Sequence, residues 1–172
     1  MIAATVAQTG TFEDGFLRQY ADVVRCAYRV LGDRVDAEDV AQDVFMRFIG
    51  RRLPEPSVMR LATVRMALNA LRSRKRRLAR ELAEYRSALP SASDSRSIDP
   101  FAIVDAQSRT VLVRAALVQL RPRDAELLLL RYSGADYRDL AQTLHIDGAQ
   151  VGMRLARAER AFRKEIDRAA IR

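Results

Sequence analysis

The chain has 172 residues, of which 49% are hydrophobic, so it can form one large or two small packed domains and is not a disordered chain. Lys and Arg number 30 against 22 Asp and Glu, and the net charge of +8 favours a polyanionic partner, either nucleic acid or an anionic membrane surface. The sequence has no apolar run of bilayer length, no leader pattern and no disulfide partner for Cys26, so we expect a cytoplasmic protein without stable membrane insertion.

Helical periodicity runs through almost the whole chain, and no segment alternates in the manner of a strand. We expect residues 1–10 to be frayed and the first helix to begin near Thr11, because Thr11 and Asp14 have capping-box spacing. Gly32 and Asp33 then end that helix.

A second helix is expected from Asp36 to Gly50, with an apolar stripe on one face. Its outer face is polar and consists of Glu38, Asp39, Gln42, Asp43 and Arg47. No His or Cys lies nearby to complete a metal site, and nothing in the sequence would bury one carboxylate as a general acid. From the pattern alone, an ordinary solvated face explains these residues equally well.

The stretch from Leu53 to Pro56 is expected to be a loop, and a third helix follows from Ser57 into a basic tract near Arg80. Four polar side chains share one face of this helix: Arg65, Asn69, Arg72 and Arg76. The basic tract contains no acid and consists of Arg72, Arg74, Lys75, Arg76, Arg77 and Arg80. Charges this dense repel one another, which favours phosphate or acidic partners over a solvated helix end. Membrane adsorption is less favoured because no Trp or Phe is interleaved.

Composition changes after Tyr85, and residues 87–98 have the small polar character of a linker. Asp99 and Pro100 have the pattern of a helix start. The sequence therefore predicts an all-α fold of two small helical domains, 11–86 and 99–172, joined by a flexible linker. We expect the two domains to behave as separate units.

The C-terminal domain contains a helix-turn-helix pattern. Asp136 with Asp139 is expected to cap its first helix, and Asp147 with Gln150 its second. The second helix has an apolar stripe behind a basic face of Gln150, Arg154, Arg157, Arg160 and Lys164. Such a helix suits the major groove of DNA, whereas a solvated helical hairpin is the alternative. His145 has no ligand or catalytic partner at suitable spacing, so we expect no metal, no cofactor and no enzyme activity.

Two motifs, in this order, resemble extracytoplasmic-function sigma factors of bacterial RNA polymerase, the minimal two-domain branch of the sigma-70 superfamily. The first is DAEDVAQDVFMR at residues 36–47, which is similar to the helix with which this family binds the polymerase clamp. The second is LVQLRPRDAELLLLRY at residues 117–132, followed by the helix-turn-helix, which resembles the fourth sigma region. The resemblance covers about residues 11–166.

The resemblance implies a transcription initiation factor with a region 2-like domain over 11–86 and a region 4-like domain over 99–172. Its implied partners are core RNA polymerase (the clamp helices of the largest catalytic subunit and the flap of the second), promoter DNA and an anti-sigma factor, with nucleoid association through the polymerase. The implied polymerase-binding residues are Asp36, Glu38, Asp39, Gln42, Asp43 and Arg47. The implied contacts to the opened downstream promoter element are Arg51, Arg52, Arg65, Asn69, Arg72, Arg74, Lys75 and Arg76, and those to the upstream duplex are Gln150, Met153, Arg154 and Arg157.

The chain departs from the family pattern at several of these positions. Val58 stands where the family usually has Trp, while Arg65 and Asn69 replace an Asn and an Asp. The recognition helix reads QVGMR at residues 150–154 instead of TVKSR, and its glycine costs about 1 kcal/mol of helix propensity relative to Ala. Two other functions therefore stay open, a stand-alone DNA-binding regulator and a sigma mimic that occupies an anti-sigma factor.

Overall fold

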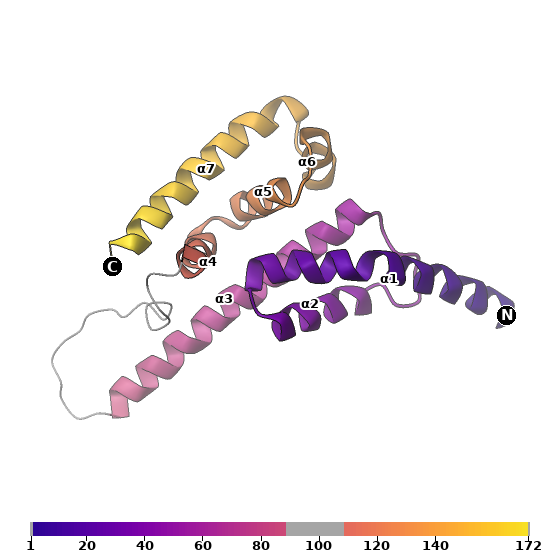
Figure 1. Cartoon of the computed structure of the whole chain (residues 1–172), viewed down its shortest axis with the longest axis horizontal. Helices are drawn as coiled ribbons and strands as arrows, with labels where there is room; N and C mark the ends of the chain where they lie inside the picture. Colours follow the sequence, from indigo (N-terminus) through magenta and orange to yellow (C-terminus); the bar gives the residue numbers. More distant parts are fainter. Residues whose placement is uncertain (1, 89–108, 172) are drawn as a thin grey trace.

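The computed structural model describes the backbone of residues 2–88 and 109–171 and the side chains of residues 12–85 and 109–171. Within these ranges the chain forms seven helices and no strand, which confirms the predicted all-α fold (Figure 1). The N-terminal lobe consists of α1 (Ile2–Leu31), α2 (Arg34–Met46) and α3 (Pro56–Ala88). The C-terminal lobe consists of α4 (Arg109–Gln119), α5 (Pro122–Tyr132), α6 (Tyr137–Leu144) and α7 (Gly148–Ala170).

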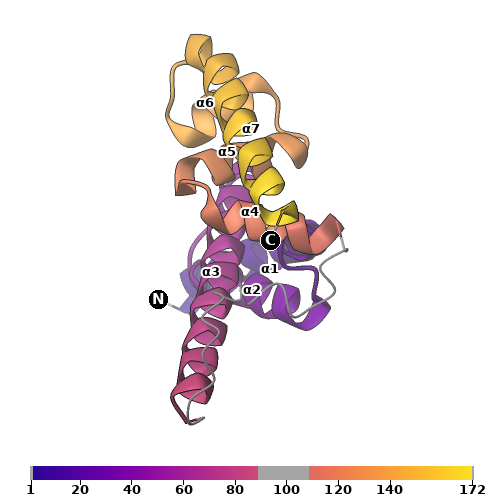
Figure 2. The ribbon, with the colours of Figure 1, turned by 90° about the vertical axis from the view of Figure 1, so that its left-hand side faces the viewer.

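The core of the N-terminal lobe forms where α1 and α2 pack against the first half of α3. Met59 and Leu68 of α3 are each 1% exposed, and Val23 of α1 and Val44 of α2 are equally enclosed. The second half of α3 extends beyond α1 and α2 as a projecting helix (Figures 1 and 2). The core therefore anchors the first half of α3, and the basic tract lies in the second half of the helix.

The first helix is longer than the sequence predicted. It begins at Ile2, so the expectation of a frayed segment over 1–10 and a helix start at Thr11 is wrong for the backbone. The segment before Thr11 contains no proline, and extending an existing helix costs far less than nucleating one. The Thr11–Asp14 capping pattern consequently lies inside a continuous helix.

The boundary between α1 and α2 is set by a glycine and a capping aspartate. Gly32 adopts φ +68°, which reverses the chain at the end of α1. Asp33, rather than Asp36, then caps α2, because the Asp33 carboxylate accepts a hydrogen bond from the backbone N–H of Asp36 at 2.9 Å. The sequence prediction placed this start too late, since Asp36 is itself in the first turn.

The third helix starts close to the predicted position and ends later. Pro56 is its first residue, where a missing N–H is harmless, and the helix continues past Arg80 to Ala88. The start of the predicted 87–98 linker is thus helical. The rest of that linker, and the predicted helix start at Asp99–Pro100, lie outside the described residues.

The helix-turn-helix forms where it was predicted, but Gln150 takes no part in capping α7, and its side-chain oxygen accepts from Arg154 instead. Asp136 and Asp139 make a reciprocal capping box on α6, and Asp147 caps α7 by accepting from the backbone N–H of Ala149. His145 closes α6 in the left-handed conformation, with φ 52°. Three residues of the predicted apolar stripe on α7 are buried, namely Val151, Leu155 and Ala158.

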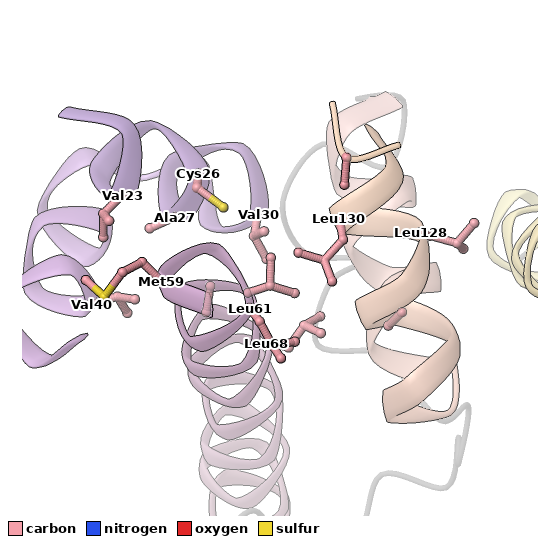
Figure 3. Packing of buried hydrophobic residues seen from close by; sticks show 14 of the residues in the cluster. Val23, Cys26, Ala27, Val30, Val40, Met59, Leu61, Leu68, Leu128 and Leu130 are labelled. Atoms are coloured by element: carbon pink, nitrogen blue, oxygen red, sulfur yellow. The ribbon is translucent and has the colours of Figure 1, made fainter. Parts of the chain in front are cut away.

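The two lobes pack against each other along α3, which contacts α4, α5 and α6. The buried apolar side chains of both lobes form one continuous cluster. Figure 3 shows how: Leu130 on α5 points toward Leu61 and Leu68 on α3, whereas Leu128 points the other way, toward α7. We expected lobes that behave as separate units, and the structure instead joins them through a shared apolar contact.

Candidate nucleic-acid and protein interfaces

The outer face of α2 is open to solvent. Asp39, Gln42, Asp43 and Arg47 are all exposed, while Asp36 and Glu38 are partly covered. Glu38 pairs with Arg34 at 2.9 Å along the same helix. Asp36 pairs with Arg74 of α3 at 3.3 Å. The more extensive contacts of α2 are with α1 and α3 only. The C-terminal lobe therefore leaves the outer face of α2 accessible.

The predicted polar face of α3 is divided between solvent and the C-terminal lobe. Asn69 is exposed. Arg65 instead donates to the Glu126 carboxylate of α5 at 3.1 Å, and Arg72 donates to the backbone carbonyl of Leu120 at 3.2 Å. Two of the predicted DNA contacts are therefore engaged by the chain itself.

The basic tract likewise faces its own acids in part. Besides the ion pair between Arg74 and Asp36, a cavity of about 450 Å³ lies between α2 and α3. The charged side chains that line it are Asp36, Asp39, Asp43, Arg74, Arg77 and Arg80. Arg76 donates to the hydroxyl of Ser73, and Lys75 is half-buried. Arg74 is thus directed toward the α2 face that was predicted to bind protein, and not toward the face that carries Arg65.

The loop before α3 covers a second cavity, of about 500 Å³, against α1. Leu53 anchors the loop in the core, and Arg51 and Arg52 are exposed on it. Gln19 of α1 reaches under the loop and donates from Nε2 to the carbonyl of Pro54 at 3.4 Å. The Oε1 atom of Gln19 is buried and has no hydrogen-bond partner, although the side chain lines the cavity. A buried acceptor without a donor is unusual, and the sequence carried no signal for it.

On α7, Gln150 and Met153 are exposed at the predicted DNA-facing positions, Met153 by 67%. Arg154 donates to the side-chain oxygen of Gln150 at 2.9 Å. Arg157 approaches the buried Asp124 of α5 at 3.9 Å. Arg154 and Arg157 also line a cleft of about 830 Å³ that runs between the lobes to Arg65. The packed lobes thus bring the two predicted DNA surfaces to opposite walls of one cleft.

Sequence reasoning missed the residues that join the lobes. Arg114 of α4 donates from Nε to the carbonyl of Val30 at the end of α1, at 3.1 Å, and burial lowers the pKa of its guanidinium below the usual value. Cys26 of α1 and Ser133, which follows α5, line one small cavity of about 300 Å³ between the lobes, and burial raises the pKa of the Cys26 thiol above its usual value. A helix-end carbonyl leaves no mark in a sequence, so the contact of Arg114 was not predictable.

Within the described ranges, no group of three or more His, Cys, Asp or Glu side chains is arranged to hold a metal ion, and no helix is long and apolar enough to cross a membrane. His145 is exposed at the turn of the helix-turn-helix. Its backbone N–H caps α6, so the role visible here is structural.

The described residues thus combine an exposed acidic helix, α2, with a capped helix-turn-helix, α6 and α7. Residues 16–81 match the family model described as Sigma-70 region 2. Over the N-terminal lobe, this match confirms the resemblance to sigma-70 sigma factors drawn from the sequence. The matched segment contains all of α2 together with the second half of α1 and most of α3.

One similar solved structure is described as the co-crystal structure of the sigma factor RpoE in complex with the anti-sigma factor NepR from Bartonella quintana. The alignment covers 91% of this chain and 96% of that chain, with 18% sequence identity and a TM-score of 0.46.

Proposed function

We propose that the protein is a two-domain sigma factor of the extracytoplasmic-function type that binds core RNA polymerase and directs it to a class of promoters. In this proposal α2 binds the polymerase clamp, the loop before α3 and the polar face of α3 hold the opened downstream element, and α7 reads the upstream element as duplex. The observation that carries the proposal is a sigma-70 region 2 match followed, in the same chain, by a capped helix-turn-helix.

The helix-turn-helix supports the reading of duplex DNA. Gln150 and Met153 are exposed at the start of α7, and the N-terminal residues of a recognition helix are those that reach base edges. Arg154 lies one turn after Gln150 and can pair with guanine, which is the commonest specific contact of an arginine in the major groove. The three buried residues behind this face hold α7 on its own lobe.

The exposure of α2 supports polymerase binding. A row of accessible carboxylates suits a basic partner surface, and charge complementarity of this kind sets the rate and specificity of association. The partner is expected to present Arg or Lys opposite Asp39 and Asp43. Polymerase docking by this face needs no rearrangement of the lobe itself.

The cavity beneath the loop supports the capture of an unpaired base from the opened strand. Its lining includes the cations Arg18, Arg52 and Arg60, which can contact the phosphates on either side of the base. The carboxylates of Asp14, Asp22 and Glu55 also line the cavity, so its charge is balanced. The unpartnered Oε1 of Gln19 can accept a hydrogen bond from an exocyclic amine, so cytosine or adenine suits the cavity better than thymine. Gln19→Leu should then weaken the preference for that base while leaving polymerase binding unchanged.

The decisive experiment is run-off transcription with core RNA polymerase, the full chain and a pool of promoter fragments. Transcripts from a shared class of promoters, absent when the chain is omitted, are the expected result. If the chain binds duplex tightly on its own, forms dimers and adds nothing to core polymerase, it is a stand-alone regulator. Failure to transcribe together with retained anti-sigma binding would instead identify a sigma mimic.

A further inference from the structure

The loop before α3 packs directly on the backbone of α1, at a glycine. Gly15 is buried within α1, and a Cβ built there would lie 2.8 Å from Cδ1 of Leu53 and 3.4 Å from the Leu53 Cβ. Contacts below 3.0 Å do not occur between such atoms, so any side chain at position 15 would displace Leu53. Leu53 is itself only 9% exposed and belongs to the apolar core. The loop can therefore approach α1 this closely only because position 15 has no side chain.

Gly15 is not explained by its backbone conformation. Glycine is unfavourable inside a helix, and Gly15 is not among the described residues with positive φ. Gly32, which does have positive φ, lies where the chain turns. At Gly152, within α7, a Cβ would meet Tyr137 at 3.7 Å, which is an ordinary contact. The feature that accounts for Gly15 is its contact with Leu53.

A second contact holds the same loop one turn further along α1. Gln19 lies four residues after Gly15, on the same face of the helix, and its Nε2 donates to the carbonyl of Pro54 at 3.4 Å. Two consecutive loop residues, Leu53 and Pro54, are thus held by two consecutive turns of α1. Pro54 and Pro56 have fixed φ, so the loop has few torsions with which to absorb a displacement of Leu53. A shift at the glycine contact is therefore passed on to Pro54.

The bond to Pro54 decides which end of the Gln19 amide is left for a ligand. A carbonyl only accepts, so the amide nitrogen must face Pro54, and the amide oxygen is left over. That oxygen, Oε1, is buried without a partner, and Gln19 lines the cavity of about 500 Å³ beneath the loop. A distance of 3.4 Å is at the long end for a hydrogen bond. A small outward displacement of Pro54 would therefore break the bond and free the amide to rotate.

We propose that Gly15 is a positioning residue for the choice of base: it lets Leu53 lie against α1, and this keeps Pro54 within reach of Gln19. This inference rests on the proposed function, in which the cavity takes an unpaired base. Gly15 does not contact the base and acts through the orientation of the Gln19 amide. With the amide oxygen fixed, a base with an exocyclic amine is favoured. With a freely rotating amide, a base that offers a carbonyl, such as thymine, is accepted as well.

Three variants separate this role from a general effect on folding. Gly15→Ala adds the one methyl group that displaces Leu53, and the helix should still form because alanine has the higher helix propensity. Adding Leu53→Val removes the displaced Cδ1, and the pair conserves the total volume, so it should restore the contact. Ala21→Leu is the matched control, because it enlarges an exposed side chain on the same helix.

The readout is run-off transcription by core polymerase and the full chain from pre-melted promoters that differ only in one unpaired base. The position to vary is the one at which Gln19→Leu changes the base preference. Gly15→Ala should lower the ratio of transcription from cytosine or adenine templates to that from thymine templates by about threefold to tenfold, the effect of one hydrogen bond. Adding Leu53→Val should restore the ratio, and Ala21→Leu should leave it unchanged.

The combination of Gly15→Ala with Gln19→Leu distinguishes positioning from an independent effect. Gly15→Ala should not change the ratio further in the Gln19→Leu background, because no amide remains to be oriented. A further fall in the ratio there would overturn the proposal. An equal loss of transcription from all templates in Gly15→Ala alone would overturn it too, since that outcome marks a purely structural role.

A second measurement needs neither polymerase nor DNA. The side-chain amide protons of Gln19, followed by NMR in the full chain, should shift and exchange faster with solvent in Gly15→Ala and should return to their original values once Leu53→Val is added. Unchanged amide signals in Gly15→Ala would overturn the proposal. If Gln19→Leu changes the base preference and Gly15→Ala does not, the proposed function stands and the positioning role fails. If the unaltered chain does not support transcription by core polymerase, the proposed function fails, and this inference fails with it.

Discussion

The α2 face and the α3 face lie on the same lobe and are equally polar, yet they have different surroundings. On α2 the carboxylates of Asp39 and Asp43 are exposed, whereas on α3 Arg65 and Arg72 bond to the C-terminal lobe. The difference follows from what lies next to each face, because α3 is the helix on which the C-terminal lobe packs. Polarity alone therefore does not tell whether a helix face is free to bind a partner.

The largest expected effect is on the α2 face. Replacing Asp39 and Asp43 by Arg should weaken binding of core polymerase by about 3 kcal/mol or more, because like charges would then oppose each other across the interface. The free energy of unfolding should change by no more than about 0.5 kcal/mol, since both side chains are exposed. Pull-down of core polymerase and urea unfolding test the two statements.

Glu13 of α1 and Asp167 of α7 provide the matched control, because both are exposed and neither belongs to the α2 face. Their replacement by Arg changes the net charge equally and should leave polymerase binding intact. Equal binding by the two double variants would mean that α2 is not the docking face, and the contrast between α2 and α3 would lose its functional meaning.

A comparison of two leucines on α5 tests what covers the α3 face. Leu130→Ala and Leu128→Ala should each destabilise the chain by about 2–5 kcal/mol, as buried leucines do when truncated. Only Leu130 points toward α3, so only Leu130→Ala should speed alkylation of Cys26 under native conditions (Figure 3). Because burial raises the pKa of this thiol, little thiolate exists at neutral pH while the lobes are packed. An equal increase for both variants would assign the effect to global unfolding.

Two glycines provide a smaller and cleaner test. Gly32→Ala and Gly50→Ala both place a side chain at positive φ, which costs about 1–2 kcal/mol. Gly32→Ala should cost more than that, because its Cβ would displace Arg114, whereas Gly50→Ala meets empty space. The difference between the two unfolding free energies measures how much the packing of Arg114 against Gly32 contributes to stability. Identical values would show that Arg114 contributes nothing there.

The smallest expected effect lies within the C-terminal lobe. Asp136→Ala removes the capping box of α6 and should cost about 0.5–2 kcal/mol of stability. Polymerase docking through α2 should not change, because the more extensive contacts of α6 are with α3, α5 and α7 and not with α2. Loss of polymerase binding in a native gel would mean that the helix-turn-helix itself contributes to docking.

Most helices were predictable because their signals are local. The capping box of Asp136 and Asp139, the prolines before α3 and the apolar period of α7 each act within a few residues. The start of α1 was not, since continuation of a helix through residues 2–10 depends on propagation and leaves no boundary residue. Sequence spacing likewise favoured Asp36 over Asp33 as the cap of α2.

The sequence predicted which side chains share a helix face, but it did not predict what each face packs against. The pattern placed Arg65, Asn69 and Arg72 on one side of α3, and they are there. It contained nothing about the carbonyl of Leu120 or the carboxylate of Glu126, which lie 48 and 61 residues away. An arginine that faces water and one that faces a distant helix end have the same local sequence.

The continuity of α3 has a mechanical consequence. From Ser57 to Ala88 the helix contains neither glycine nor a further proline, the usual causes of a kink. Its projecting end, near Arg80, and Arg72, which donates to the carbonyl of Leu120, are therefore parts of one stiff helix, separated by about 12 Å at the helical rise of 1.5 Å per residue. A force applied to the tip acts as torque about the anchored end at Met59, so a polyanion that captures the tip can strain the bond from Arg72 to Leu120 without touching either residue.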